Sequence, residues 1–150
     1  MDGSSACLVS CVESHLDRLL NEGTDRHGAT PTAMWMANLD TRTGALPPAG
    51  HTPGRVYRLI GAPNGVTCYW DQPSLAAARV LARVTGKAAY ADAADAYVRD
   101  FIARCSAADG VLQWGNPAYY AAASGAVVPC SGGYHEVRPI QADGDSRGAV

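Results

Sequence analysis

Hydrophobic residues recur at helical spacing near the start of the chain. Between about residues 5 and 22 they stand three or four positions apart, at Leu8, Val12, Leu16, Leu19 and Leu20. Ser4 or Ser5 can cap the start of such a helix, and Gly23 is placed to end it. The pattern therefore predicts a first helix over these residues.

The middle of the chain has two more helical patterns, separated by Gly86. The first follows Asp71 as a helix cap and Pro73 in the first turn, with apolar positions at Leu75, Ala78, Val80, Leu81 and Val84. The second places its larger side chains on one face, at Tyr90, Ala94, Tyr97, Phe101 and Cys105. Because only a short turn separates them, we expect an antiparallel helix pair over residues 73–105.

The remaining segments favour loops and short strands. Proline and glycine between residues 24 and 63 prevent long regular elements, apart from the apolar run Met34–Leu39, so a loop layer over the core is expected there. Short aromatic pieces follow Gly110, and residues 142–150 are expected to form a frayed tail. The predicted fold class is mainly α, with long loops and a few short strands, in a single domain over residues 1–150.

Composition narrows the function classes. The chain of 150 residues is 47% hydrophobic and 17% charged, which argues against a disordered protein. A net charge of −2 without a basic run argues against nucleic acid as a partner. We expect no membrane span and no signal peptide in this chain. The expected location is therefore cytoplasmic. If a leader has been lost, the expected location is secreted or periplasmic. The five cysteines are interpreted as small buried hydrophobic residues rather than a disulfide framework.

Three clusters could carry chemistry. The first is Tyr69-Trp70-Asp71-Gln72, where the aromatic rings can form a platform for a sugar and the polar pair can bind its hydroxyls. The plainer interpretation is a helix cap with two packed rings. The second is residues 114–120, which contains Trp114, Asn116, Tyr119 and Tyr120 on an irregular segment.

The third cluster, residues 132–139, contains His135, Glu136 and Arg138, and its plainer interpretation is a Glu136–Arg138 surface pair. No metal site is predicted. Cys7, Cys11 and His15 repeat every fourth residue, but positions eight apart on a helix are about 12 Å apart, too far for one zinc ion. Sequence motifs for nucleotide binding and serine hydrolysis are absent, and the pattern leaves the cofactor unknown.

Several of these segments, taken in order over about residues 16–141, resemble the bacterial α/α-toroid polysaccharide lyase-like proteins, described as pectate or pectic acid lyase-like. The segments that carry the resemblance are residues 24–28, 34–44, 69–73, 90–105, 114–116 and 135–139. The resemblance implies a partial α/α toroid built of antiparallel helix hairpins. Because a complete ring needs about six hairpins, the chain is expected to be an N-terminal portion.

The resemblance also implies β-elimination on an acidic, uronate-containing polysaccharide. Asn116 and Arg138 would neutralise the sugar carboxylate, and Tyr119, Tyr120 or His135 would transfer protons. Trp70 and Trp114 would stack on sugar rings, with Asp71, Gln72 and Glu136 as further substrate-binding residues. Pro117 and Ala118 stand where the family has titratable residues, so the isolated chain is expected to show no strong lyase activity.

Two alternatives remain open. The first is a glycoside hydrolase on the same kind of ring, with Asp71 and Glu136 as its carboxylate pair. The second is a carbohydrate-contacting domain without catalysis. If neighbouring hairpins are missing, an exposed apolar helix face is expected, and self-association through that face becomes an option.

Overall fold

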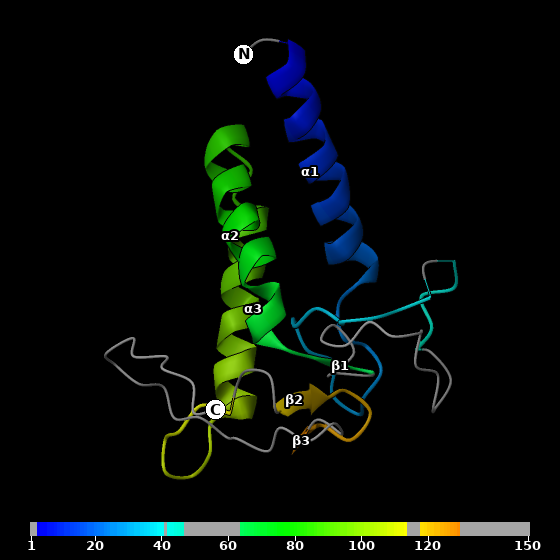
Figure 1. Cartoon of the computed structure of the whole chain (residues 1–150), viewed down its shortest axis with the longest axis vertical. Helices are drawn as coiled ribbons and strands as arrows, with labels where there is room; N and C mark the ends of the chain where they lie inside the picture. Colours follow the sequence, from blue (N-terminus) through cyan, green and yellow to red (C-terminus); the bar gives the residue numbers. More distant parts are fainter. Residues whose placement is uncertain (1–2, 41, 47–63, 114–117, 130–150) are drawn as a thin grey trace, which may run out of the picture.

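Three helices make up most of the regular structure of this protein, whose computed structural model describes residues 3–40, 42–46, 64–113 and 118–129. In the described residues, the helices are α1 (Gly3–Glu22), α2 (Cys68–Thr85) and α3 (Ala89–Cys105). A small antiparallel sheet of β1 (Gly65–Val66), β2 (Ala118–Ala121) and β3 (Ala126–Pro129) lies at one end of the helices (Figure 1). The prediction of a mainly α fold with a few short strands is confirmed.

The predicted antiparallel helix pair is also confirmed. α2 and α3 lie side by side, and Gly86 ends α2 in a left-handed conformation with φ of 74° (Figure 1). The backbone N–H of Gly86 donates to the carbonyl of Ala82, which satisfies one of the last free acceptors of the helix. All five residues of the predicted α3 stripe are buried, because their spacing puts them on one face.

The predicted start of α2 is wrong. The helix begins at Cys68, directly after β1, and Thr67 occupies the cap position with an extended backbone. Asp71 therefore lies inside the first turn instead of capping it, and Pro73 lies within the helix. Since β1 leads into α2 through one residue, pairing of β1 with β2 fixes where the helix can begin.

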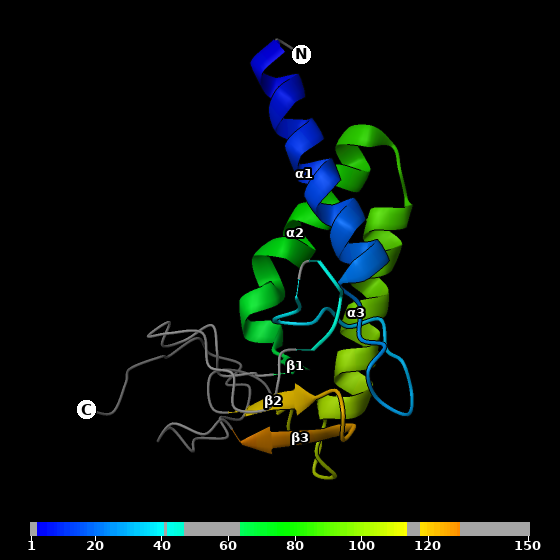
Figure 2. The same cartoon turned by 90° about the vertical axis from the view of Figure 1, so that its right-hand side faces the viewer.

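α1 packs against the helix pair through its C-terminal half. Leu16 is buried, and the Tyr90 hydroxyl of α3 donates a hydrogen bond of 2.7 Å to Asp17. Lys87, in the turn between α2 and α3, forms an ion pair of 2.8 Å with Glu13. Figure 2 shows that the N-terminal part of α1 extends beyond that turn.

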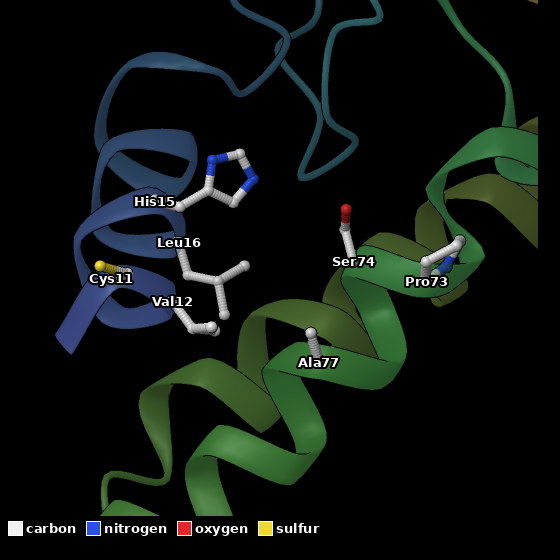
Figure 3. Close-up of a pocket in the computed structure, with 7 residues that line it drawn as sticks. All are labelled: Cys11, Val12, His15, Leu16, Pro73, Ser74 and Ala77. Atoms are coloured by element: carbon white, nitrogen blue, oxygen red, sulfur yellow. The ribbon is translucent and has the colours of Figure 1, made fainter. Parts of the chain in front are cut away.

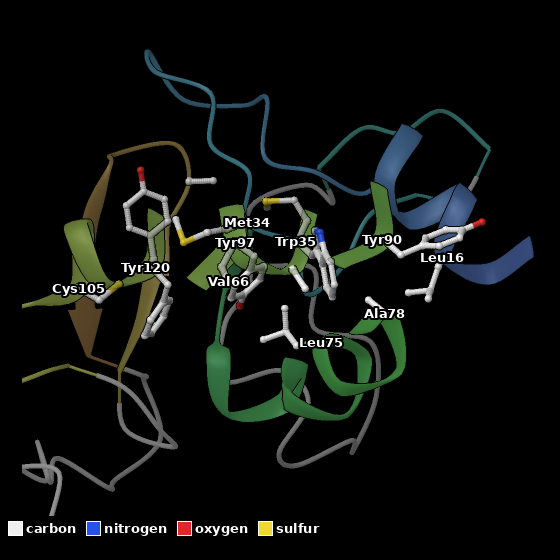
Figure 4. Close-up of a cluster of buried hydrophobic side chains, with 14 of the residues drawn as sticks. Leu16, Met34, Trp35, Val66, Leu75, Ala78, Tyr90, Tyr97, Cys105 and Tyr120 are labelled. Carbon is white, nitrogen blue, oxygen red and sulfur yellow. The ribbon is translucent and has the colours of Figure 1, made fainter. Parts of the chain in front are cut away.

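Residues 34–36 form part of the core instead of a layer over it. Met34, Trp35 and Met36 are all buried, and the Trp35 ring contacts the Tyr97 ring of α3 edge to face, with centroids 5.2 Å apart. Figure 4 shows these side chains meeting others from α1, α2, α3 and β2. The apolar run that the sequence analysis set apart from the surrounding loop therefore belongs to the core at residues 34–36.

The fully buried Asp25 holds the loop before Met34 in place. Its carboxylate accepts hydrogen bonds from the backbone N–H of His27 and from the Thr32 hydroxyl, both at 3.1 Å. The backbone N–H of Asp25 donates to the carbonyl of Met34, and the backbone N–H of Thr32 donates to the carbonyl of Asp25. A buried carboxylate with several donors is stable in this position because the hydrogen bonds replace its lost hydration.

Candidate functional site

The first turn of α2 presents two aromatic side chains next to each other. Tyr69 and Trp70 make an edge-to-face contact with ring centroids 5.0 Å apart and ring planes at 89°. Tyr69 is 45% exposed and Trp70 is half-buried. Partly exposed rings with polar ends suit the alternating apolar and hydroxyl surfaces of a sugar.

Asp71 follows the aromatic pair and is bonded to the core. Its carboxylate accepts a hydrogen bond of 2.5 Å from the hydroxyl of Tyr97 on α3. Burial raises the pKa of Asp71 from its ordinary value of 3.8 to about 6, and the hydrogen bond from Tyr97 acts in the opposite direction. This side chain can therefore take up or release a proton in mildly acidic solution, as acid–base groups in active sites do.

Tyr97 provides a fixed donor to Asp71. Its ring is fully buried between those of Trp35 and Phe101. Burial raises the pKa of Tyr97 most, and the negative charge of Asp71 raises it further. The phenol therefore keeps its proton at neutral pH and orients the carboxyl of Asp71 without taking up its proton.

The cysteines around this pair are poor nucleophiles. Burial, with a smaller effect of Asp71, raises the pKa of Cys68 to about 11. Burial raises the pKa of Cys105 to about 12. Because the thiolate is the reactive form, neither residue is suited to nucleophilic catalysis at neutral pH.

The two predicted tyrosines of β2 face opposite sides of the sheet. Tyr120 is buried, with the guanidinium of Arg104 5.7 Å above its ring centroid and 3.3 Å from its hydroxyl oxygen. Burial raises the pKa of Tyr120, and Arg104 partly offsets this effect. Tyr119 is half-buried, and its ring lies against Gly65, where a Cβ atom would come within 2.5 Å of the ring.

Of the predicted site residues, Trp70, Asp71 and Gln72 lie together at the start of α2, where Gln72 is exposed. Tyr119 lies on the neighbouring sheet, which is joined to α2 through β1. Five predicted residues lie outside the described part of the chain, namely Trp114, Asn116, His135, Glu136 and Arg138. The structure therefore places the predicted sugar-contacting residues Trp70, Asp71 and Gln72 together in α2. The residues predicted to neutralise the sugar carboxylate, Asn116 and Arg138, lie outside the described residues.

No family model matches the chain, and no curated protein matches it.

Neither a metal centre nor a membrane span is found in the part of the chain that the structure describes. Its His, Cys, Asp and Glu side chains form no group of three or more that could hold a metal ion. Among the described residues, no helix combines the length and the apolar character needed to cross a bilayer.

A hydrogen-bond partner of the site escaped the sequence analysis. Tyr97 was assigned to the apolar stripe of its helix, and its ring does lie in the core, but its hydroxyl contacts Asp71. The predicted helix pair could have indicated this contact, since an antiparallel hairpin brings the start of α2 towards the second half of α3. A buried tyrosine needs a partner for its hydroxyl, and Asp71 was a nearby acceptor.

Proposed function

We propose that this chain is a portion of a polysaccharide lyase-like protein, part of an α/α toroid, that acts on an acidic polysaccharide by β-elimination. The observation that carries the proposal is the Tyr69–Trp70 aromatic pair next to Asp71 in the same helical turn. The rings offer a surface for a sugar, and Asp71 offers a carboxyl group that changes its charge in mildly acidic solution.

In β-elimination the proton next to the uronate carboxylate leaves, the bond to the leaving oxygen breaks, and a conjugated double bond forms. The negative charge that grows on the carboxylate must be stabilised by hydrogen bonds or positive groups. A protonated Asp71 donates such a hydrogen bond, whereas an ionised Asp71 repels the uronate. Asn116 and Arg138 are proposed as further stabilising groups, with Tyr119, Tyr120 or His135 in proton transfer. Tyr119 has the more exposed side chain of the two tyrosines.

A specific observation favours a second candidate, a glycoside hydrolase. The general acid of such an enzyme must be protonated near its working pH, and burial raises the pKa of Asp71 to about 6. Glu136 is the proposed second carboxylate. A domain that contacts carbohydrate without catalysis remains the third candidate, supported by the aromatic pair alone.

Binding of a uronate oligomer is the primary test. Calorimetric titration with oligomers from polygalacturonate, alginate and glucuronan is expected to show tighter binding at pH 5 than at pH 7, because protonation of Asp71 removes a negative charge from the site. Trp70→Ala is expected to weaken binding roughly tenfold. Asp71→Asn, which resembles the protonated form, is expected to bind with little pH dependence.

The controls separate the candidates. A neutral oligosaccharide is expected to show no such pH dependence, and Arg42→Gln, on an exposed loop, is expected to bind as the unmodified chain does. Ultraviolet absorbance of the unsaturated product identifies elimination, and new reducing ends without that absorbance identify hydrolysis. Binding without either product is the result expected of a lyase portion that lacks the remaining hairpins, and it is equally the result expected of the non-catalytic domain. Absence of binding to every uronate oligomer contradicts the proposal.

A further inference from the structure

The two carboxylate oxygens of Asp71 have different surroundings. Oδ2 accepts a hydrogen bond of 2.5 Å from the hydroxyl of Tyr97, which holds it against the core. Oδ1 has no hydrogen-bond donor among the described residues, where the buried side-chain atoms that lack a partner are Trp35 Nε1 and Thr67 Oγ1. Since Oδ1 has no partner and is not one of these buried atoms, it reaches the surface of the molecule.

The surface of α2 beside Asp71 is also open. Ser74, one helical turn after Asp71, lines the groove between α1 and α2. Figure 3 shows its hydroxyl pointing into the space between the two helices. Side chains three positions apart on a helix are neighbours, so α1 does not seal this side of α2 next to Asp71.

The hydroxyl of Tyr97 is held in place by packing on its ring. The ring is fully buried, contacts Trp35 edge to face with centroids 5.2 Å apart, and stacks on Phe101 at 6.3 Å. Figure 4 shows Trp35 and Tyr97 next to each other. The loop that carries Trp35 is tied to the helix of Tyr97, because the backbone N–H of Ala33 donates to Asp100 at 2.7 Å. The core therefore sets the position of this hydroxyl.

This arrangement determines which oxygen of Asp71 carries the proton when the carboxyl group is protonated. Burial raises the pKa of Tyr97, so the phenol keeps its own proton, and Oδ2 of Asp71 is its one acceptor among the described residues. With the acid proton on Oδ2, the phenol would have to turn and accept it. The hydrogen of the phenol would then be buried without an acceptor, which costs free energy. The acid proton is therefore more stable on Oδ1.

We propose that Tyr97 is a positioning residue that confines the acid proton of Asp71 to Oδ1, and so makes Oδ1 the hydrogen-bond donor to the substrate carboxylate. This inference rests on the proposed function, because it takes the substrate to be a uronate. A donor with a fixed direction binds a carboxylate more tightly than a donor that rotates, since less freedom is lost on binding.

Tyr97 also sets the pH at which this donor is lost. Its hydrogen bond favours the ionised form of Asp71 and lowers the pKa, against the larger effect of burial, and no described Lys, Arg or His side chain shifts it. Cys68 lies one turn earlier on α2 and Cys105 ends α3. Burial raises the pKa of both thiols, so both are uncharged near neutral pH. Removing the Tyr97 hydroxyl is therefore expected to raise the pKa of Asp71 above about 6.

The first experiment follows the carboxyl carbon of Asp71 in the free protein by NMR. The titration midpoint is expected near pH 6 in the unmodified chain and at a higher pH in Tyr97→Phe, because the ionised form loses its donor. Tyr90→Phe is the matched control. It removes the hydroxyl of another buried tyrosine of α3, which donates at 2.7 Å to Asp17 instead. In this control Asp71 is expected to titrate as in the unmodified chain.

The second experiment measures binding of a uronate oligomer against pH by calorimetry. Tyr97→Phe is expected to move the loss of binding to higher pH. It is also expected to weaken binding about threefold near pH 4.5, where Asp71 is protonated in both proteins. In an Asp71→Asn background, Tyr97→Phe should weaken binding by a similar factor without changing the pH dependence, because the amide does not ionise. Tyr90→Phe should change neither quantity, and circular dichroism checks that each variant remains helical.

The outcomes separate this inference from the proposed function. An unchanged midpoint of Asp71 in Tyr97→Phe overturns the inference, and so does an equal change in Tyr90→Phe. A raised midpoint with undiminished binding near pH 4.5 overturns the assignment of Oδ1 as the donor to the substrate. Absence of uronate binding to the unmodified chain contradicts the proposed function and, with it, the substrate contact. The titration uses no carbohydrate, so it still decides whether Tyr97 controls the proton of Asp71.

Discussion

At the scale of single residues, the carboxyl of Asp71 combines a structural and a chemical role. The hydroxyl of Tyr97 holds it at 2.5 Å, and burial raises its pKa to about 6. In the unfolded chain the same group titrates near 3.8. Between these two values the folded protein binds more protons than the unfolded chain, so this residue lowers the stability of the fold as the pH rises.

Asp71→Asn is expected to remove this pH-dependent loss. The variant keeps an oxygen that accepts the hydrogen bond from Tyr97, but it cannot ionise. As the pH rises from about 4 to above 6, the unmodified chain should lose up to about 3 kcal/mol of unfolding free energy relative to the variant. Urea unfolding at a series of pH values measures it. A constant difference over this range would contradict the raised pKa.

The sequence predicted that Trp70, Asp71 and Gln72 contact a sugar, and this stays a prediction. Trp70, Asp71 and Gln72 were selected because an aromatic and polar cluster before an apolar stripe is unusual, and the structure places them in one helical region. The contact between Asp71 and Tyr97 joins residues 26 positions apart, and it depends on how two helices pack. Local spacing carries little information about such a contact, which explains why the hydroxyl of Tyr97 was not assigned a partner.

At the scale of helices and strands, two glycines act in different ways. Gly86 has a φ of 74° at the end of α2, and a Cβ atom there would meet nothing within 4 Å, so its role is conformational. Gly65 lies in β1 close to β2, and a Cβ atom there would be 2.3 Å from the carbonyl oxygen of Tyr120. Any side chain at position 65 therefore collides with backbone.

Gly86→Ala is expected to cost about 1 to 2 kcal/mol of unfolding free energy, the usual penalty of a left-handed conformation for a residue with a Cβ. Gly65→Ala should cost clearly more, because the backbone of β2 must move and the β1–β2 pairing is disturbed. Thermal unfolding of the two variants gives the comparison. A smaller loss for Gly65→Ala than for Gly86→Ala would show that β1 has room to adjust.

Helices were predicted more successfully than the segments between them. The α3 stripe has large residues at helical spacing over five positions, so its buried face follows from the pattern alone. Met34, Trp35 and Met36 form a run without either helical or strand periodicity, and their burial results from packing against α3. The start of α2 was misplaced because β1 is only two residues long and gives no pattern of its own.

At the scale of the whole molecule, α1 is held by the buried Leu16, by the partly buried Val9, Leu19 and Leu20 that pack against the core, and by two polar contacts. Leu16 is 1% exposed, while the Lys87 and Glu13 side chains are 59% and 24% exposed. Burial of an aliphatic side chain contributes more than an ion pair that water can reach, because water and salt screen the charges. Packing of Leu16 is therefore expected to determine how firmly α1 is held.

Leu16→Ala should reduce the unfolding free energy by about 2 to 5 kcal/mol, because it leaves a cavity between α1 and the helix pair. Lys87→Gln should reduce it by less than about 1 kcal/mol, and added salt should reduce that small difference further. Urea unfolding followed by circular dichroism gives the values. An equal loss of unfolding free energy in Lys87→Gln and Leu16→Ala would show that charge, and not apolar packing, holds α1 in place.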